Sequence, residues 1–184
     1  MVFSLTVITA IASASLGFVY QLTKEPKAVA LKVKQNFAIK AVLLEYDNDP
    51  LADAFFIKSF DSDAKLICYP AKKNGLLTGI AVNTWTMEGF SGLVRLMVGF
   101  DKTGNIVNIS VLEHKETPGL GTKMADAEFK DQYKGKNPGI NKLAMKKEHG
   151  EIDAITAATI SSRAFSDAVE RAYKSLEKAG KFEK

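Results

Sequence analysis

The first 23 residues carry no charged side chain and are mostly apolar. The run Val2–Leu22 holds 21 residues, and a helix of about 20 residues spans the hydrocarbon core of a bilayer. Its small residues permit close helix packing, and its Ser and Thr hydroxyls can bond back to their own helix. A cleaved signal peptide and a buried core helix are the alternatives. A signal peptide requires basic residues before its apolar run, and this run has none before it. The pattern favours a transmembrane helix over residues 1–23 that packs against other membrane helices.

The next stretch mixes lysines with apolar residues at a helical period. The apolar positions recur every three or four residues, as on one helix face, and are Val29, Val33, Phe37, Ala41 and Leu44. Pro26 is expected to interrupt the helix near its start, and residues 47–50 (Asp-Asn-Asp-Pro) to end it. We therefore predict an amphipathic helical connector over residues 24–50.

From residue 65 onward the sequence pattern becomes typical of β-strands. Runs rich in Val, Ile, Leu and aromatic residues are separated by turn signals such as Asn74-Gly75, and they cover residues 65–69, 76–87, 93–100 and 106–114. Such runs predict a meander of antiparallel strands. Residues 51–64 are expected to be irregular.

Weaker patterns follow the fourth strand. Residues 124–133 suit a short helix, residues 143–147 and 152–155 suit two further strands, and residues 161–179 form an amphipathic last helix. The predicted fold class is α+β: one transmembrane helix, then a twisted antiparallel sheet flanked by helices, with the sheet domain over residues 51–184.

Composition and charge exclude several function classes. Hydrophobic residues make up 46% and charged residues 25% of the chain, which excludes wholesale disorder. One cysteine, Cys68, cannot form an internal disulfide or hold an iron–sulfur cluster. The net charge of +4 matches the excess of lysine in residues 24–40, so the remainder is neutral overall and nucleic acid is not an expected partner.

Two loops hold candidate binding residues between strands or after them. Residues 114–121 (His-Lys-Glu-Thr-Pro-Gly-Leu-Gly) follow a strand, and their glycines would let the backbone approach a ligand closely. Residues 89–92 (Gly-Phe-Ser-Gly) join two strands and would leave room for a planar ligand. Ordinary tight turns are the alternative for both loops. His114 and Glu116 lack a nearby third ligand, so no metal site is predicted.

A third candidate lies directly before the last helix, in residues 153–162. It holds four hydroxyl residues within seven positions, Thr156, Thr159, Ser161 and Ser162. A helix cap is the plain interpretation, since Ser and Thr are common there. The same position also suits a phosphate, because a helix N-terminus offers free N–H groups and the positive end of the helix dipole.

Taken together, these loops resemble motifs of the FMN-binding subunits of bacterial respiratory sodium or proton pumps. Residues 153–159 (Asp-Ala-Ile-Thr-Ala-Ala-Thr) resemble the flavinylation motif Asp-x-x-Ser/Thr-Gly-Ala-Thr of that family. Residues 114–121 resemble its His-x-Glu-Thr-Pro-Gly-Leu-Gly loop, residues 89–92 its Gly-Tyr-Gly-Gly turn, and residues 22–26 the junction after its membrane helix. The chain is most similar to the G subunit of the Rnf-type ferredoxin:NAD oxidoreductase. It departs from the motifs at Ala157, where the family has Gly, and at Phe90 and Ser91.

The resemblance implies a covalent flavin. The hydroxyl of Thr159 would carry FMN through a phosphoester bond, which a separate flavin transferase would install from FAD. The implied cofactor residues, besides Thr159, are Asp153, Thr156, Ala157, Ala158, Ser161, Glu116, Thr117, Gly119, Leu120, Gly121 and Phe90. Trp85 is a further candidate to stack on the ring, although core packing is favoured for it. The flavin would relay electrons, so no catalytic acid or base and no complete active site are expected in this chain.

The resemblance also implies a location and partners. The chain would be a single-pass protein of the inner or plasma membrane, with its flavin domain on the outer face. The excess of lysine after residue 23 favours the opposite orientation by the positive-inside rule, but partner subunits can fix topology. Other membrane, flavin and iron–sulfur subunits are the implied partners.

Three alternatives to this function stay open. One is the C subunit of the sodium-translocating NADH:quinone reductase, to which the chain is also similar, although those proteins tend to be longer. Another is a non-redox, membrane-tethered binding module whose threonines merely cap a helix. The third is a free-standing flavoprotein of anaerobic respiration.

Overall fold

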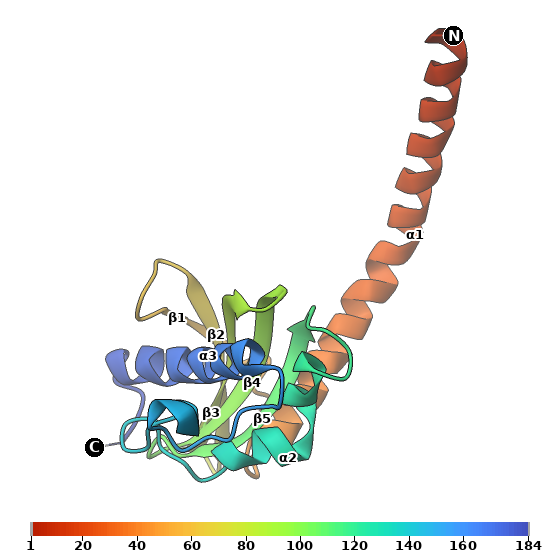
Figure 1. The fold of residues 1–184 in the computed structure, drawn as a ribbon. Coiled ribbons are helices and arrows are strands. Elements are labelled where there is room, and N and C mark those ends of the chain that lie inside the picture. Colours follow the sequence, from red (N-terminus) through yellow and green to blue (C-terminus); the bar gives the residue numbers. More distant parts are fainter. Residues whose placement is uncertain (1, 184) are drawn as a thin grey trace. The chain divides into compact units, whose positions relative to one another are not determined.

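The computed structural model describes residues 2–183, apart from the side chains of residues 27 and 28. It contains a long N-terminal helix, a five-stranded sheet and a long C-terminal helix (Figure 1). The elements are α1 Val2–Val42, β1 Phe55–Lys58, β2 Lys65–Lys73, β3 Leu76–Gly89, β4 Gly92–Asp101, β5 Ile106–His114, α2 Ala127–Lys130 and α3 Thr159–Lys178, with short 3-10 turns at Gly121–Ala125, Asp131–Tyr133 and Lys146–Glu148. The predicted α+β class, an apolar helix followed by an antiparallel sheet with helices, is confirmed.

Helix α1 crosses the boundary between two compact units, which falls between Asn36 and Phe37. Its N-terminal part is long and apolar enough to cross a membrane by length and composition, with a mean hydropathy of 2.0 over its most apolar window. Hydroxyls there bond back to the helix as predicted; Thr6 Oγ1, for example, donates to the Val2 carbonyl at 3.0 Å. This satisfies polar groups that lipid could not.

The predicted interruption of the helix at Pro26 is wrong, because α1 runs through that residue without a break. Proline removes one main-chain hydrogen bond and leaves those of the neighbouring turns, so the helix can continue through it. The helix ends at Val42, several residues before the predicted stop at residues 47–50. The predicted division of the chain at residues 23 and 50 stays a prediction.

The end of α1 packs against one face of the sheet, and it uses a different helix face from the predicted one. Ala38, Ile39 and Val42 are buried with sheet residues including Met97, whereas Phe37 is 75% exposed. Residues 37–44 are apolar around most of the helix, so periodicity alone could not decide which side faces the sheet. Close approach here depends on Gly99, where a Cβ would overlap the Val42 carbonyl.

The sheet is an antiparallel meander in the order β1-β2-β3-β4-β5. The expectation that residues 51–64 are irregular is wrong where they form strand β1. The sequence did not indicate this strand, because four residues at the edge of a sheet are too few to show a clear alternation. Helix α3 lies across the second face (Figure 1), where Thr84 on β3 donates a hydrogen bond from its hydroxyl to the Ala168 carbonyl at 2.9 Å. The main core lies between α3 and this face.

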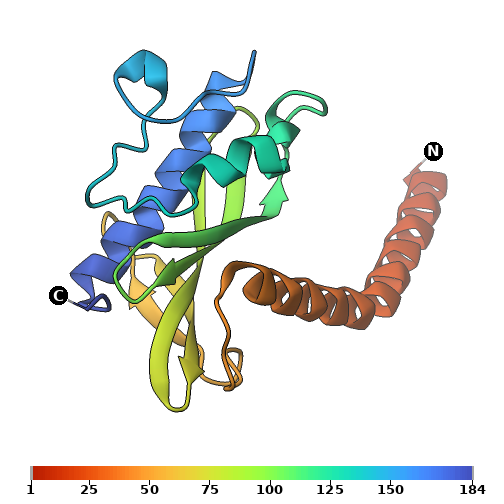
Figure 2. The same ribbon diagram turned by 90° about the horizontal axis from the view of Figure 1, so that it is seen from below.

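The long segment between β5 and α3 differs most from its prediction (Figure 2). The predicted helix over 124–133 is broken into a 3-10 turn, the single turn α2 and a second 3-10 turn. The predicted strands at 143–147 and 152–155 are absent from this segment, which has one parallel bridge between Met145 and Ile152. Both residues are buried in the core, so the apolar pattern reports burial without a strand. Helix α3 begins at Thr159, two residues before the predicted start.

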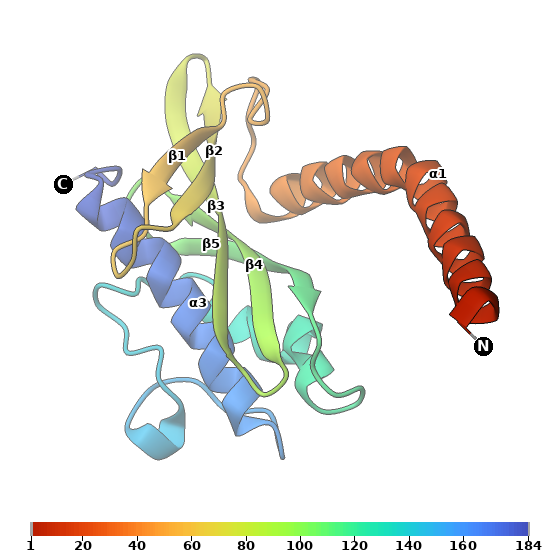
Figure 3. The same ribbon diagram turned by 90° about the horizontal axis from the view of Figure 1, so that it is seen from above.

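Helix α3 lies beside the loop between β1 and β2 (Figure 3), and Arg171 on the helix bonds to Asp61 in that loop. Its guanidinium donates to both carboxylate oxygens of Asp61, at 2.7 and 2.6 Å, and lies 5.4 Å from the centre of the Trp85 ring. The Arg171 side chain is only 12% exposed. Partial burial raises the pKa of Asp61, but the hydroxyl of Ser59 and the charge of Arg171 outweigh it, so the net pKa is lowered.

We expect Asp61→Asn to destabilise the fold by about 1–2 kcal/mol at pH 7, because a nearly buried guanidinium loses the nearer of its two carboxylate partners and keeps only Asp167, at 3.3 Å. Urea unfolding of the full chain in detergent measures this. The lowered pKa of folded Asp61 means that its stabilisation is complete above the ordinary value of 3.8 and is lost as the pH falls through the folded value. The two proteins should therefore converge in acid. Asp63→Asn is the control, since the Asp63 side chain is 96% exposed, and an equal loss in both variants would contradict the prediction.

Candidate functional site

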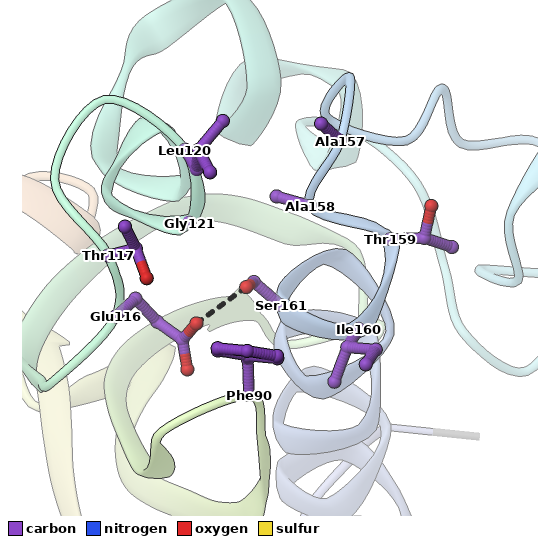
Figure 4. Close-up of a pocket in the computed structure, with 10 residues that line it drawn as sticks. All are labelled: Phe90, Glu116, Thr117, Leu120, Gly121, Ala157, Ala158, Thr159, Ile160 and Ser161. Atoms are coloured by element: carbon purple, nitrogen blue, oxygen red, sulfur yellow. Dashed lines mark hydrogen bonds between the residues drawn. The ribbon is translucent and has the colours of Figure 1, made fainter.

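A cavity of about 340 Å³ lies where the β3–β4 turn, the loop after β5 and the start of α3 meet (Figure 4). We call it the Glu116 cavity. Its lining residues are Phe90, Glu116, Thr117, Leu120, Gly121, Ala157, Ala158, Thr159, Ile160 and Ser161. The three loops singled out in the sequence thus converge on one space, although their lining residues lie up to 71 positions apart in the chain.

A buried carboxylate forms the floor of this cavity. Glu116 is 5% exposed and accepts a hydrogen bond from the Ser161 hydroxyl at 2.6 Å and one from the Ser91 N–H at 3.1 Å. No cation pairs with it among the described residues, so hydrogen bonds alone satisfy it. Because its partners belong to α3 and the β3–β4 turn, Glu116 ties all three cavity elements together (Figure 4).

Two glycines make room for this carboxylate. A Cβ on Gly121 would lie 2.6 Å from Ser161 Oγ and 2.7 Å from Glu116 Oε2. A Cβ on Gly89 would lie 2.6 Å from Glu116 Oε1. Side-chain carbons do not approach other atoms this closely, so both positions require glycine. In contrast, a Cβ on Gly119 would meet nothing within 4 Å, and Gly119 does not line the cavity.

The wall on the α3 side is a tight turn before the helix. Ser162, fully buried in α3, accepts a hydrogen bond from the Ile155 N–H at 2.9 Å and donates one to the Ala158 carbonyl at 3.0 Å. Ala157 within this turn has a φ of 62°, in the left-handed region. This conformation explains physically why glycine suits the position, since a Cβ is strained there.

Ala157→Gly is expected to stabilise the fold by about 1 kcal/mol, because it removes the strain of a left-handed alanine. Thermal unfolding of the full chain in detergent, followed by circular dichroism, measures the change. Ala158→Gly is the matched control: Ala158 has a φ of −136° and is buried, so glycine there should lower the stability. A fall in melting temperature for Ala157→Gly would refute the strain argument.

Thr159 is the first residue of α3 and is half-buried at the edge of the cavity. Figure 4 shows its side chain directed away from Phe90, Glu116 and Ser161. The Ala158 cap before it makes no side-chain hydrogen bond to the helix N-terminus. The start of this helix therefore offers N–H groups and the positive end of its dipole beside the cavity.

Three predicted cofactor residues lie outside the cavity lining: Gly119, Asp153 and Thr156. Asp153 and Thr156 instead line two neighbouring hollows. The Asp153 carboxylate accepts a hydrogen bond from Lys146 Nζ at 2.6 Å, and its backbone is held by Gln132. Trp85 also lies elsewhere, packed at the edge of the core under Arg171.

The predicted cofactor residues do not include two contributors, Ile160 in the cavity lining and Ser162 behind the turn. Both were visible only as members of an amphipathic helix or a hydroxyl cluster. Residues 2–183 hold no group of three or more His, Cys, Asp and Glu placed to bind a metal ion. Burial raises the pKa of the Cys68 thiol to about 12, so it stays protonated in the core.

Comparison with known proteins identifies the family. A family model described as FMN-binding domain matches residues 89–174, which include every residue lining the Glu116 cavity. The chain is 34% identical over 177 residues to the G subunit of the ion-translocating oxidoreductase complex of Stutzerimonas stutzeri, covering 92% of this chain and 76% of that protein. The chain belongs to this G-subunit family. The resemblance predicted from the loop motifs is confirmed.

A second G subunit also supports membership of the family, and a solved structure shows the same fold. The G subunit of the same complex in Photorhabdus laumondii is 30% identical over 177 residues, covering 91% of this chain and 85% of that protein. A solved structure of the C subunit of the Na⁺-translocating NADH-quinone reductase from Parabacteroides distasonis shares the fold, with a TM-score of 0.50 and 18% identity over 73% of this chain and 70% of that one.

Proposed function

We propose that this chain is an electron-transfer subunit of an ion-translocating oxidoreductase complex and carries FMN covalently on Thr159. The observation that carries the proposal is the convergence of the three flavin-family loops on one cavity with a threonine hydroxyl at its edge. Bound FMN would supply the redox chemistry, and the protein would fix its position and potential. In this proposal the chain works with the other membrane, flavin and iron–sulfur subunits of the complex and needs no complete active site of its own.

The residues present suit this cofactor. Phe90, Leu120 and Ile160 give the Glu116 cavity apolar walls for a planar ring. Glu116 and Thr117 supply hydrogen-bonding groups, and the glycine at 121 keeps the floor open. A phosphate at Thr159 would lie at the N-terminus of a 20-residue helix, where anions are favoured.

Attachment would need an external transferase. Thr159 Oγ1 would bond to the flavin-side phosphorus of FAD, the pyrophosphate P–O bond would break, AMP would leave, and a base of the transferase would take the hydroxyl proton. Mass action favours a covalent link, because a non-covalent cofactor is kept only where its free concentration exceeds its Kd. That condition fails on the outer face of a membrane, where we place this domain. The apolar part of α1 would anchor it.

The test is to co-express the full chain with a flavin transferase, denature it in SDS and examine the protein band for flavin fluorescence. A fluorescent band, with the modified peptide mapped by mass spectrometry, is the expected result. A dark band would overturn the proposal and favour a membrane-tethered binding module whose threonines only cap a helix.

A further inference from the structure

A second hollow, of about 270 Å³, lies beside Thr159. Its lining residues are Met145, Lys146, Lys147, Asp153, Ala154, Ile155, Thr156, Ala157 and Thr159. We call it the lysine hollow. It shares only Ala157 and Thr159 with the Glu116 cavity. Thr159 lines both spaces, and its side chain is directed away from Phe90 and Glu116 (Figure 4).

The two spaces differ in chemistry. The Glu116 cavity has Phe90, Leu120 and Ile160 on its walls and its only acid is hydrogen-bonded on the floor. The lining of the lysine hollow includes two exposed lysines, Lys146 and Lys147, and one aspartate, Asp153. The Asp153 carboxylate neutralises Lys146 at 2.6 Å, whereas Lys147 has no acidic partner in the part of the chain that the structure describes. The hollow therefore carries one uncompensated positive charge.

The backbone that presents these lysines is firmly held. The Lys146 N–H donates to the Ile152 carbonyl at 2.8 Å, and the Gly150 N–H to the Met145 carbonyl at 3.1 Å. Met145 and Ile152 are both buried in the core. Glu148, the next residue after the lysines, accepts a hydrogen bond from Arg163 Nε on α3 at 2.6 Å. The loop is thus fixed to the same helix that carries Thr159.

From this geometry we infer that the lysine hollow is the binding site for the phosphate of the attached flavin. The inference rests on the proposed function. Lys147 is the main charge partner, and Lys146, shared with Asp153, is the second. A phosphodiester carries one negative charge at neutral pH, which matches the single uncompensated charge of the hollow. Thr159 then marks the junction at which the phosphate faces the lysines and the remainder of the cofactor faces the apolar cavity.

Lysine acylation with residue-level mass spectrometry tests this site on the full chain. The flavin-loaded wild-type chain is compared with Thr159→Ala, both co-expressed with the transferase. Acylation needs the unprotonated amine, and a neighbouring anion favours the ammonium form, so we expect Lys147 to react about threefold more slowly in the loaded protein. Lys65, exposed at the start of β2 and outside both spaces, is the internal control and should react equally in both.

A second measurement uses the phosphorus itself. We expect Lys147→Gln to move the ³¹P resonance of the loaded chain, Lys147→Arg to restore it, and Lys65→Gln to leave it unchanged. Equal acylation of Lys147 with and without flavin, or an unmoved resonance in Lys147→Gln, would overturn the assignment of the lysine hollow as the phosphate site. A fluorescent band in the same samples would still support the proposed function. A third outcome is a reduced flavin yield in Lys147→Gln together with no protection of Lys147 in the loaded wild-type chain. It would assign the lysine to the transferase step and would also overturn the phosphate site. A dark wild-type band would overturn both proposals.

Discussion

Replacing Thr159 with alanine is expected to abolish the flavin that survives denaturation. The residue lies at the first position of α3, between the Glu116 cavity and the lysine hollow, and is the only hydroxyl residue that lines both. Without that oxygen no phosphoester can form at this position. In-gel fluorescence of the full chain, co-expressed with the transferase, should fall to background.

Two further variants separate chemistry from folding. Thr159→Ser keeps the hydroxyl and should keep a fluorescent band, whereas Thr159→Val keeps the side-chain shape and should be dark. On chains expressed without the transferase, near-ultraviolet circular dichroism should show the same tertiary packing in all three variants, because Thr159 is only half-buried. Fluorescence that persists in Thr159→Ala would move the attachment to another hydroxyl, and peptide mapping would then locate it among Thr156 and Ser161.

How far the sequence predicts this molecule depends on the range of the interactions involved. The strands β2 to β5 and helix α3 follow from local alternation and helical periodicity, and the structure confirms them with small changes at their ends. Strand β1 forms because it pairs with β2, with Phe55 opposite Cys68. The four residues of β1 alone do not indicate this pairing. The face of α1 that covers the sheet is likewise decided by tertiary contact, since both sides of residues 37–44 are apolar.

The candidate site shows the same division. Motifs in three loops predicted most of the residues that line the Glu116 cavity, but not why they meet. The decisive contact joins Glu116 to Ser161, 45 positions apart, and neither residue's own neighbourhood indicates a buried carboxylate without a cation. The left-handed φ of Ala157 is similar: an alanine there gives no local signal, and only the turn held by Ser162 requires it.

Gly121→Ala is expected to remove most of the flavin-carrying capacity of the chain, although it adds a single methyl group. The new Cβ would lie 2.6 Å from Ser161 Oγ and 2.7 Å from both Glu116 Cβ and Glu116 Oε2. Either the Glu116–Ser161 hydrogen bond breaks or the loop 117–121 shifts, and both changes alter the floor of the cavity. Overpacking of this kind also destabilises a fold by about 1–3 kcal/mol.

Gly119→Ala is the control that separates the cavity from general instability. Gly119 belongs to the same loop, is exposed and has a φ of 76°, so alanine there is strained by about 1–2 kcal/mol. Its Cβ would meet no atom within 4 Å, however, so the cavity keeps its shape. With both variants scored for urea stability and for fluorescence after SDS, we expect comparable losses of stability and a loss of flavin only in Gly121→Ala. Equal flavin content in the two would show that the Glu116–Ser161 floor does not shape the cofactor site, and would leave Thr159 and the wall residues to carry the binding alone.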